Sequence, residues 1–368
     1  MLYQALIQAF WPGPLTLLFP SPDPPPLPAP QTNAIRMPSH PLALALIHHS
    51  DLPLSAPSAN SSGRPSPTKA QHVFNDLNGK AGLGCILDGG DCGVGVESTV
   101  VDALGWKEGG GGFVDILRPG GLGVEKVAEV VQSVDGGDWT EIRIHGKPWR
   151  VNAEASSSKL PPVPPATEVA RAVKPTLAPS TPGMKYRHYS PRVPVYLLLP
   201  SNTFPKPSPT STTPPSPSFS PSDIVRPIAS AIRRDRRPRI GLMHYENSPL
   251  ARSMLQPTFA QEHDIEVVSI SLGADATSAA QRLFSGMLSL EGKRALQDGS
   301  NGDTVVQVAS GQDTSDGVDV ILVEGCSDEG LGLAVMERVG KAVGGGGKTG
   351  ELGNGEGEGT QGRFWVQV

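Results

Sequence analysis

The sequence has 368 residues, which is long enough for two domains that each bury a hydrophobic core. Its formal net charge of −5 argues against a general polyanion-binding protein, so any contact with RNA has to be a local patch. Three cysteines (Cys85, Cys92, Cys326) form neither a disulfide framework nor a zinc pattern, and no apolar run approaches a membrane span, which favours a reducing, cytoplasmic location without a membrane partner.

The first half of the chain alternates segments of helical and of strand character. Apolar residues recur at helical spacing between Leu2 and Phe10, and the Trp11-Pro12 pair ends that helix. Glycines at residues 89–95 turn the chain sharply into a strand that starts at Ser98. We predict helices over residues 2–10, 41–49, 70–77 and 122–134, with 41–49 buried, and strands over residues 15–19, 32–37, 85–88, 98–102 and 115–118.

Residues 54–68, called the central loop below, combine small side chains, hydroxyl groups and prolines. Small side chains let a ligand approach the backbone, and hydroxyl and amide groups can bond phosphate or sugar oxygens. Ser66 or Thr68 is expected to cap the next helix, whose N-terminus is a ready anion site. On composition alone, a plain solvated turn is the alternative interpretation.

The second half begins with a Pro- and Ser-rich linker over residues 146–182. Residues 185–191 mix cations with aromatic side chains and are either a basic linker or a strap over a bound nucleotide. Residues 200–221 have the composition of a disordered insertion. The arginine-rich run 233–239 is interpreted as a helix-end cationic cap, with RNA contact as the alternative.

Strands and helices alternate again after the linker, which predicts a parallel sheet with helices on its faces. The predicted strands are 195–199, 240–244, 266–272 and 318–323, and the predicted helices are 224–233, 276–290 and 331–342. Residues 344–368 are predicted to be a flexible Gly-rich tail.

Seven short motifs follow one another along the chain, at residues 10–18, 36–41, 55–63, 94–102, 117–120, 182–191 and 329–336. They include Ser-Ala-Pro-Ser-Ala-Asn at 55–60, Gly-Val-Glu-Ser-Thr-Val-Val-Asp at 95–102 and Lys-Tyr-Arg-His-Tyr-Ser-Pro at 185–191. Their sequence and order resemble the threonylcarbamoyl-adenylate synthases. The resemblance is to the two-domain type, in which a YrdC-like domain precedes a C-terminal domain.

The resemblance implies an α/β fold: an N-terminally truncated YrdC-like twisted α/β domain followed by a smaller Rossmann-like α/β domain with a parallel sheet. The expected organisation is a partial nucleotide- and threonine-binding domain (1–145), a linker with an active-site strap (146–192), a small α/β domain (193–343) and the tail (344–368). Family members carry a Lys-x-Arg motif and strands upstream that this sequence lacks, so the chain is expected to be truncated, which leaves open whether it is active as it stands.

The implied activity is that of a nucleotidyltransferase. It condenses L-threonine, bicarbonate and ATP into threonylcarbamoyl-AMP and pyrophosphate, with Mg²⁺ on the phosphates, and feeds a tRNA threonylcarbamoyl transferase complex. The resemblance carries nucleotide binding to Thr32, Ser58, Asn60, Ser66, Arg118, His188 and Tyr189, and threonine binding to Arg36, Ala56 and Ser98. No residue is an obvious nucleophile, base or metal ligand, so catalysis is expected to rest on positioning and charge stabilisation.

Two alternatives belong to other functional classes. One is a non-catalytic module that binds a nucleotide, double-stranded RNA or tRNA, and the other is a regulatory remnant of the C-terminal domain type. An in-frame Lys-x-Arg segment upstream of Met1 would favour the enzyme over both.

Overall fold

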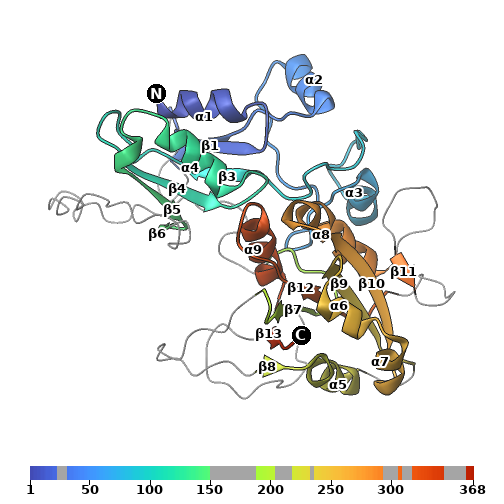
Figure 1. The fold of residues 1–368 in the computed structure, drawn as a ribbon. Helices are drawn as coiled ribbons and strands as arrows, with labels where there is room; N and C mark the ends of the chain where they lie inside the picture. The colour runs from blue at the N-terminus through green and yellow to red at the C-terminus, as the bar shows by residue number, and fades with distance from the viewer. Residues whose placement is uncertain are drawn as a thin grey trace. The chain divides into compact units, whose positions relative to one another are not determined.

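The computed structural model describes residues 1–22, 31–149, 188–203, 218–232, 236–292, 306–308, 317–343 and 362–368. The chain forms two compact units, each with its own β-sheet (Figure 1). Unit 1 comprises Met1–His49 and Ser98–Lys185, and unit 2 comprises Ser50–Glu97 and Tyr186–Val368. Residues 50–97 therefore group with the C-terminal half, although chain order places them inside the predicted first domain.

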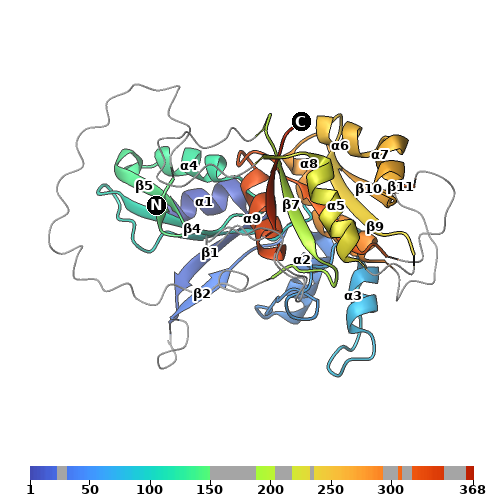
Figure 2. The same cartoon turned by 90° about the horizontal axis from the view of Figure 1, so that it is seen from below.

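Unit 1 is built on a sheet with the strand order β2-β1-β3-β4-β5-β6. Its helices α1 and α4 pack against each other and lie side by side in Figure 2, with Leu6 and Val127 among their fully buried side chains. The strands are β1 (Leu15–Pro20), β2 (Thr32–Ile35), β3 (Thr99–Asp102), β4 (Gly112–Arg118), β5 (Thr140–Ile144) and β6 (Lys147–Pro148). The helices are α1 (Leu2–Phe10), α2 (Pro41–Ser50), α4 (Val124–Gln132) and the 3-10 turn Gly137–Trp139.

The pairing of β1 with β3 decides where the polar motif of unit 1 lies. The two strands run parallel with Leu15 opposite Thr99, and the Thr99 amide donates to the Pro14 carbonyl oxygen at 2.9 Å. Thr16 pairs with Val100, and Ser98 lies two residues before Val100, so Ser98 and Thr16 meet diagonally across the two strands. Two segments far apart in the sequence thereby share one end of the sheet.

Three sequence predictions for residues 41–88 are wrong. The predicted helix 41–49 forms as α2, but none of its residues is buried, and Leu46 is 47% exposed. Its apolar residues are spread around the helix, so no single face is marked for packing. Residues 85–88 form no strand, because the run is short and has no partner among the described strands. Helix α3 (Ala70–Leu77) begins after Lys69 without a side-chain cap, since Ser66 bonds elsewhere.

Unit 2 contains a seven-stranded sheet with the order β11-β10-β9-β12-β7-β13-β8. All described strand pairs are parallel except β10 with the edge strand β11. The strands are β7 (Val195–Pro200), β8 (Ser218–Phe219), β9 (Arg239–Tyr245), β10 (Glu266–Gly273), β11 (Val306–Val308), β12 (Val320–Glu324) and β13 (Arg363–Val366). This sheet confirms the predicted Rossmann-like architecture.

Helices cover both faces of this sheet and bury two separate clusters of apolar side chains. One cluster includes Phe284 of α8 (Ala276–Glu291) and Val335 of α9 (Gly332–Ala342). The other includes Ile224 and Leu250, from the helices of the opposite face. Those helices are α5 (Pro221–Ala231), α6 (Pro249–Met254) and α7 (Pro257–Glu262), of which α6 and α7 are too short to leave a periodic signal in the sequence.

Two segments that were predicted to be disordered or flexible contribute short strands to the sheet of unit 2. β8 lies inside the predicted disordered insertion 200–221, and β13 lies inside the predicted tail 344–368, where it pairs with β7 and β8. β13 shows why the tail prediction was wrong at this point: four residues acquire strand structure only because an edge of the sheet is available. The predicted linker 146–182 falls outside the described residues from 150 onward, as do residues 204–217 and 344–361.

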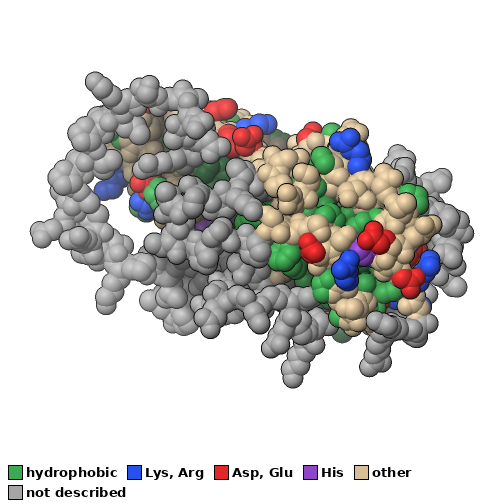
Figure 3. Space-filling model, turned by 60° about the horizontal axis from the view of Figure 1, so that its bottom comes forward, with side chains coloured by type: hydrophobic (Ala, Val, Ile, Leu, Met, Phe, Trp, Pro, Cys, Tyr) green, Lys and Arg blue, Asp and Glu red, His purple; other side chains and the backbone are tan. Residues whose placement is uncertain are grey.

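The described arginines of the 233–239 run are all paired with carboxylates. Arg236 bonds Asp319 at 2.5 Å, and Arg237 and Arg239 lie 2.8 and 3.2 Å from acidic side chains. On the face shown in Figure 3, cationic and acidic side chains likewise lie in small mixed groups. This pairing favours a structural role for the run. Within the described ranges, no helix has the length and apolar character that a membrane crossing requires.

Replacing Leu322 should test the core of unit 2. Leu322 is fully buried in β12, between β9 and β7, so Leu322→Ala should lower the free energy of unfolding by about 2–5 kcal/mol through lost contacts and a cavity. Leu255→Ala, at a position 37% exposed, is the matched control and should cost less than about 1 kcal/mol. Urea unfolding measures the free energy of unfolding of both variants. Equal decreases in this free energy would contradict the described core.

Candidate functional site

The ten predicted site residues are divided between the two units. Unit 1 carries Thr32, Arg36, Ser98 and Arg118, and unit 2 carries Ala56, Ser58, Asn60, Ser66, His188 and Tyr189. Within each unit some of these residues are joined by hydrogen bonds and others stand apart. The joined ones form two polar clusters, one around Ser98 and one around Glu97.

The first cluster, in unit 1, surrounds the buried Ser98. The hydroxyl groups of Ser98 and Thr16 are 2.7 Å apart, a contact that follows from the parallel pairing of β1 with β3. Arg118, at the end of β4, donates from Nε and Nη2 to the Ser98 carbonyl oxygen at 3.2 and 3.0 Å, and Nη2 also lies 3.3 Å from Ser98 Oγ. One guanidinium thus orients both polar atoms of a predicted threonine-binding residue.

The other predicted residues of unit 1 lie on or after strand β2. Thr32 is the first residue of β2 and is half-buried, whereas Arg36 follows the strand and is exposed. β1 lies between β2 and the β3 end where Ser98 is found. The β1–β2 register sets Leu17 opposite Ile35, so Arg36, the next residue, comes level with Thr16 of the Ser98 cluster, whereas Thr32 lies opposite Pro20 at the other end of β2.

In unit 2, the central loop presents its predicted residues in two different environments. Ala56 and Ser58 are exposed, so a ligand can reach the backbone there. Asn60 is half-buried and donates to the Ser61 carbonyl oxygen at 2.8 Å. Ser66 is only 8% exposed and donates its hydroxyl proton to Glu97 Oε1 at 2.6 Å. The buried end of the loop is therefore fixed, while its beginning is open to solvent.

The second cluster centres on Glu97, the residue before Ser98. Arg338 of α9 donates from Nε to Glu97 Oε2 at 2.9 Å and is itself 1% exposed. The Arg338 guanidinium lies over the ring of Tyr189, 5.7 Å from its centroid, and His188 packs against the same ring with centroids 4.3 Å apart. Ser66, His188 and Tyr189, all predicted for the nucleotide, are thereby brought into one network.

Three members of these clusters were missed by sequence reasoning: Thr16, Glu97 and Arg338. Glu97 lies inside the motif 94–102, between a glycine turn and the predicted Ser98, so the motif itself was the available signal. Arg338 follows the motif 329–336 by two residues and stands 241 positions after its partner. An isolated arginine in an amphipathic helix is usually exposed to solvent, so the sequence does not indicate that Arg338 is buried.

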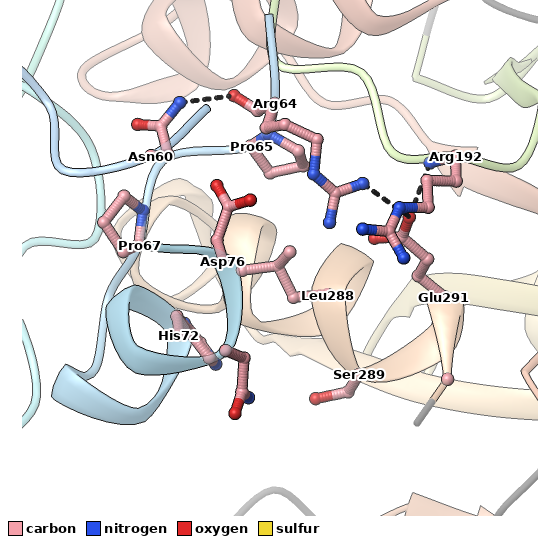
Figure 4. Close-up of a pocket in the computed structure, with 12 residues that line it drawn as sticks. Asn60, Arg64, Pro65, Pro67, His72, Asp76, Arg192, Leu288, Ser289 and Glu291 are labelled. Atoms are coloured by element: carbon pink, nitrogen blue, oxygen red, sulfur yellow. Dashed lines mark hydrogen bonds and ion pairs between the residues drawn. The ribbon is translucent and has the colours of Figure 1, made fainter. Parts of the chain in front are cut away.

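A cavity of about 90 Å³ lies between the central loop, α3 and the end of α8 (Figure 4). Of the predicted site residues only Asn60 lines it. Its two guanidiniums converge on one carboxylate: Arg64 donates to Glu291 Oε1 at 2.5 Å, and Arg192 lies 3.6 Å from the same oxygen. The two lining carboxylates, Glu291 and Asp76, together balance the two guanidiniums, and the Arg64–Glu291 ion pair joins the central loop to α8.

Two ionisable side chains of this cavity have shifted pKa values. Burial alone would raise the pKa of Asp76, but hydrogen bonds from Ser61 and the charges of Lys80 and Arg64 hold it below its usual range. Burial, with the nearby charge of Lys69, lowers the pKa of His72 to about 4. At neutral pH the cavity therefore contains an ionised aspartate and a neutral histidine. The described residues contain no group of three His, Cys, Asp or Glu side chains that could hold a metal ion.

The sequence matches two protein-family models. The family described as "Telomere recombination" matches residues 2–120, and the family described as "Threonylcarbamoyl-AMP synthase, C-terminal domain" matches residues 154–344. The Schizosaccharomyces pombe protein named threonylcarbamoyl-AMP synthase is 35% identical over 355 residues, which cover 93% of this chain and 66% of the relative. Proteins of the same name from Pyrococcus abyssi and Bacillus subtilis are each 31% identical, with 93% of this chain and 73% of each relative covered.

Solved structures of Pyrococcus abyssi Sua5 show a similar fold. The complex with L-threonine has a TM-score of 0.55 at 30% identity and covers 93% of this chain and 74% of the archaeal one. A doubly substituted variant of the same protein has a TM-score of 0.57 at 28% identity and covers 100% and 75%. The similarity extends over both family regions, and the chain spans two thirds to three quarters of the length of these relatives.

The lowered pKa of His72 predicts a specific pH dependence of stability. Its neutral ring, which accepts from the Thr68 amide at 3.2 Å, is favoured by the fold, so this contribution is present above pH 6.5 and is lost as the pH falls toward 4. His72→Asn keeps an acceptor without a titrating ring and should lose about 2 kcal/mol less than the wild type over that range.

Urea unfolding between pH 7 and pH 4.5 measures this difference, and NMR titration of the ring measures the pKa directly. His49→Asn, at the end of α2, is the control for replacing a histidine. A His72 pKa near 6.5, or the same pH dependence in wild type and His72→Asn, would show that the described environment of the ring is incorrect.

Proposed function

Because this chain belongs to the threonylcarbamoyl-AMP synthase family, we propose that it condenses L-threonine, bicarbonate and ATP into threonylcarbamoyl-AMP with release of pyrophosphate. The observation that carries the proposal is the match over both family regions, with motif residues gathered in the Ser98 and Glu97 clusters. A nucleotidyltransferase needs donors for phosphate and carboxylate oxygens, and the serine hydroxyl groups of these clusters and the Arg118 guanidinium are donors of that kind.

Threonine is assigned to Ser98, Ala56 and Arg36. The archaeal relative has been solved with L-threonine bound, which supports an amino-acid site in this family. Arg118 holds the Ser98 hydroxyl and carbonyl oxygen in fixed directions, so Ser98 can present its hydroxyl to a carboxylate without first being ordered. ATP is assigned to Thr32, Ser58, Asn60, Ser66, Arg118, His188 and Tyr189.

The chemistry depends on positioning because neither cluster has a group arranged as a nucleophile or a general base. Carboxylation of the threonine amine and attack of the carbamate on the α-phosphorus need the reactants aligned and the developing charge stabilised. Mg²⁺ is proposed to arrive with the ATP phosphates, which supply most of its ligands together with water. A closed site would protect the carbamate and the mixed anhydride from hydrolysis.

The product is proposed to pass to the tRNA threonylcarbamoyl transferase complex, with tRNA as a further contact. A cytoplasmic location fits that partner and the three free cysteines, Cys85, Cys92 and Cys326.

Pyrophosphate release tests the proposed reaction. The full 368-residue chain should release pyrophosphate from ATP only when threonine and bicarbonate are both present, because the adenylate forms on the carbamate. The assay omits each co-substrate in turn, and a continuous pyrophosphate-coupled readout gives the rate. Release that is independent of threonine would contradict the proposed reaction. Nucleotide binding with no turnover in any mixture would also contradict it and would favour a binding module.

Replacing Ser98 tests the threonine site separately. Ser98→Ala removes a hydroxyl held by Arg118 and Thr16, so the KM for threonine should rise about tenfold while the KM for ATP stays within about twofold. Ser133→Ala, at the exposed end of α4 in the same unit, is the matched control and should leave both values unchanged. Equal changes in both KM values would argue against the threonine assignment.

A further inference from the structure

Arg338 is the most deeply buried charged side chain among the described residues of unit 2. It is 1% exposed, and its guanidinium is engaged on three sides. Nε and Nη2 lie 2.9 and 2.7 Å from Glu97 Oε2, and Nη1 donates to the Ala334 carbonyl oxygen at 3.0 Å. A guanidinium removed from water needs such partners, since an unpaired buried charge is strongly destabilising. Its third side faces Tyr189.

The other end of the carboxylate reaches the central loop. Glu97 Oε1 accepts the hydroxyl proton of Ser66 at 2.6 Å, so the two oxygens of one carboxylate join α9 to the loop. The backbone conformation of Gly95, two residues earlier, allows Glu97 to lie between the central loop and α9. Gly95 has a φ of +79°, and a Cβ there would lie 2.4 Å from the Cα of Gln281 on α8, so only glycine allows the chain to pass so close to the helix.

Tyr189 adopts a backbone conformation that needs external support. Its φ of +61° lies in the left-handed region, which is rare for a bulky side chain. Its ring is 2% exposed and packs against Phe284 with centroids 5.1 Å apart, with the Arg338 guanidinium 5.7 Å from the ring centroid. The next residue, Ser190, donates its amide proton to the Gly63 carbonyl oxygen at 2.8 Å. Such backbone strain persists only where the surroundings determine the conformation.

We propose that Arg338 is a positioning residue for the nucleotide site. Through Glu97 it fixes Ser66 at the end of the central loop, and over the ring of Tyr189 it holds the strap, here residues 188–191, in its strained conformation. Arg338 itself acts on the substrate only through these two residues. The effect of Arg338 on ATP affinity rests on the proposed function, whereas its role in holding the central loop and the strap does not.

Lysine cannot replace arginine in this arrangement. The guanidinium plane serves Glu97, the Ala334 carbonyl oxygen and the aromatic ring together, whereas an ammonium group is a point charge on a flexible stem. Arg338→Lys should therefore keep the charge balance of Glu97 and recover only part of the lost function. Arg338→Met removes the charge and keeps most of the apolar volume.

The kinetic test compares the KM for ATP with the KM for threonine in the full chain. Arg338→Met should raise the KM for ATP at least tenfold and leave the KM for threonine and kcat within about threefold, with Arg338→Lys between Met and wild type. Arg239→Met is the matched control: Arg239, the first residue of β9, is 6% exposed and is ion-paired to Glu266 at 3.2 Å, a residue outside the loop and the strap. Parallel changes in both KM values and kcat, or the same change in Arg239→Met, would overturn the proposal.

Hydrogen exchange tests the same proposal without turnover. Exchange in peptides covering 60–68 and 188–192 should be at least tenfold faster in Arg338→Met than in wild type and in Arg239→Met. If the wild-type chain releases no pyrophosphate but this acceleration is seen, the proposed function fails and the holding role stands. Unchanged exchange overturns the holding role whatever the activity. If Arg338→Met does not fold, the double variant Glu97→Gln/Arg338→Met removes both charges of the ion pair and carries the same two measurements.

Discussion

The ion pair between Glu97 and Arg338 is the interaction on which the described site of unit 2 depends. Arg338 is almost fully removed from water while Glu97 is 20% exposed, and the cost of burying the guanidinium is offset only when its partners satisfy its charge and its hydrogen-bonding capacity. Here the carboxylate accepts from Ser66 as well, and the guanidinium also serves a helix carbonyl and an aromatic ring. One ion pair, with a buried guanidinium and a partly exposed carboxylate, thus holds a central-loop residue and a strap residue, and its two members are 241 residues apart in the sequence.

This arrangement suits a reaction that is accelerated by alignment. Where no nucleophile or base is offered, the rate depends on how closely the protein holds the substrates near their reacting geometry, and small displacements are costly. The same logic applies in unit 1, where Arg118 orients both oxygens of Ser98. In both clusters an arginine that is itself fixed orients a serine, which is the group assigned to the substrate.

Sequence reasoning succeeded where the physical signal was local. The helix at 276–290 and the strands at 240–244 and 266–272 were predicted because their apolar residues follow helical or strand spacing, and the structure places them within a residue or two. The resemblance identified Ser98, Ser66 and Tyr189, which lie in the two clusters, and Arg36, which the β1–β2 register places level with Thr16. Thr32 lies at the far end of β2, so its distance from the Ser98 cluster is set by the strand register.

The sequence predictions that failed depended on contacts between residues far apart in the chain. An apolar run at 41–49 predicts a buried helix, but burial needs a partner surface that no local pattern specifies, and α2 is exposed. β13 becomes a strand because an edge of the unit 2 sheet is free to pair with it. Arg338 was not identified from the sequence, because its carboxylate partner is 241 residues away. Pairing over such separations is a property of the folded chain.

A double-mutant cycle on Glu97 and Arg338 tests the central claim most directly. Urea unfolding of wild type, Glu97→Gln, Arg338→Met and the double variant gives the coupling free energy, which should be on the order of 1.5–3 kcal/mol if the two side chains act as one ion pair. The double variant should then be more stable than the sum of the two single losses predicts. Losses that add within about 0.5 kcal/mol would show that Glu97 and Arg338 act independently and would contradict the pair as the basis of the site.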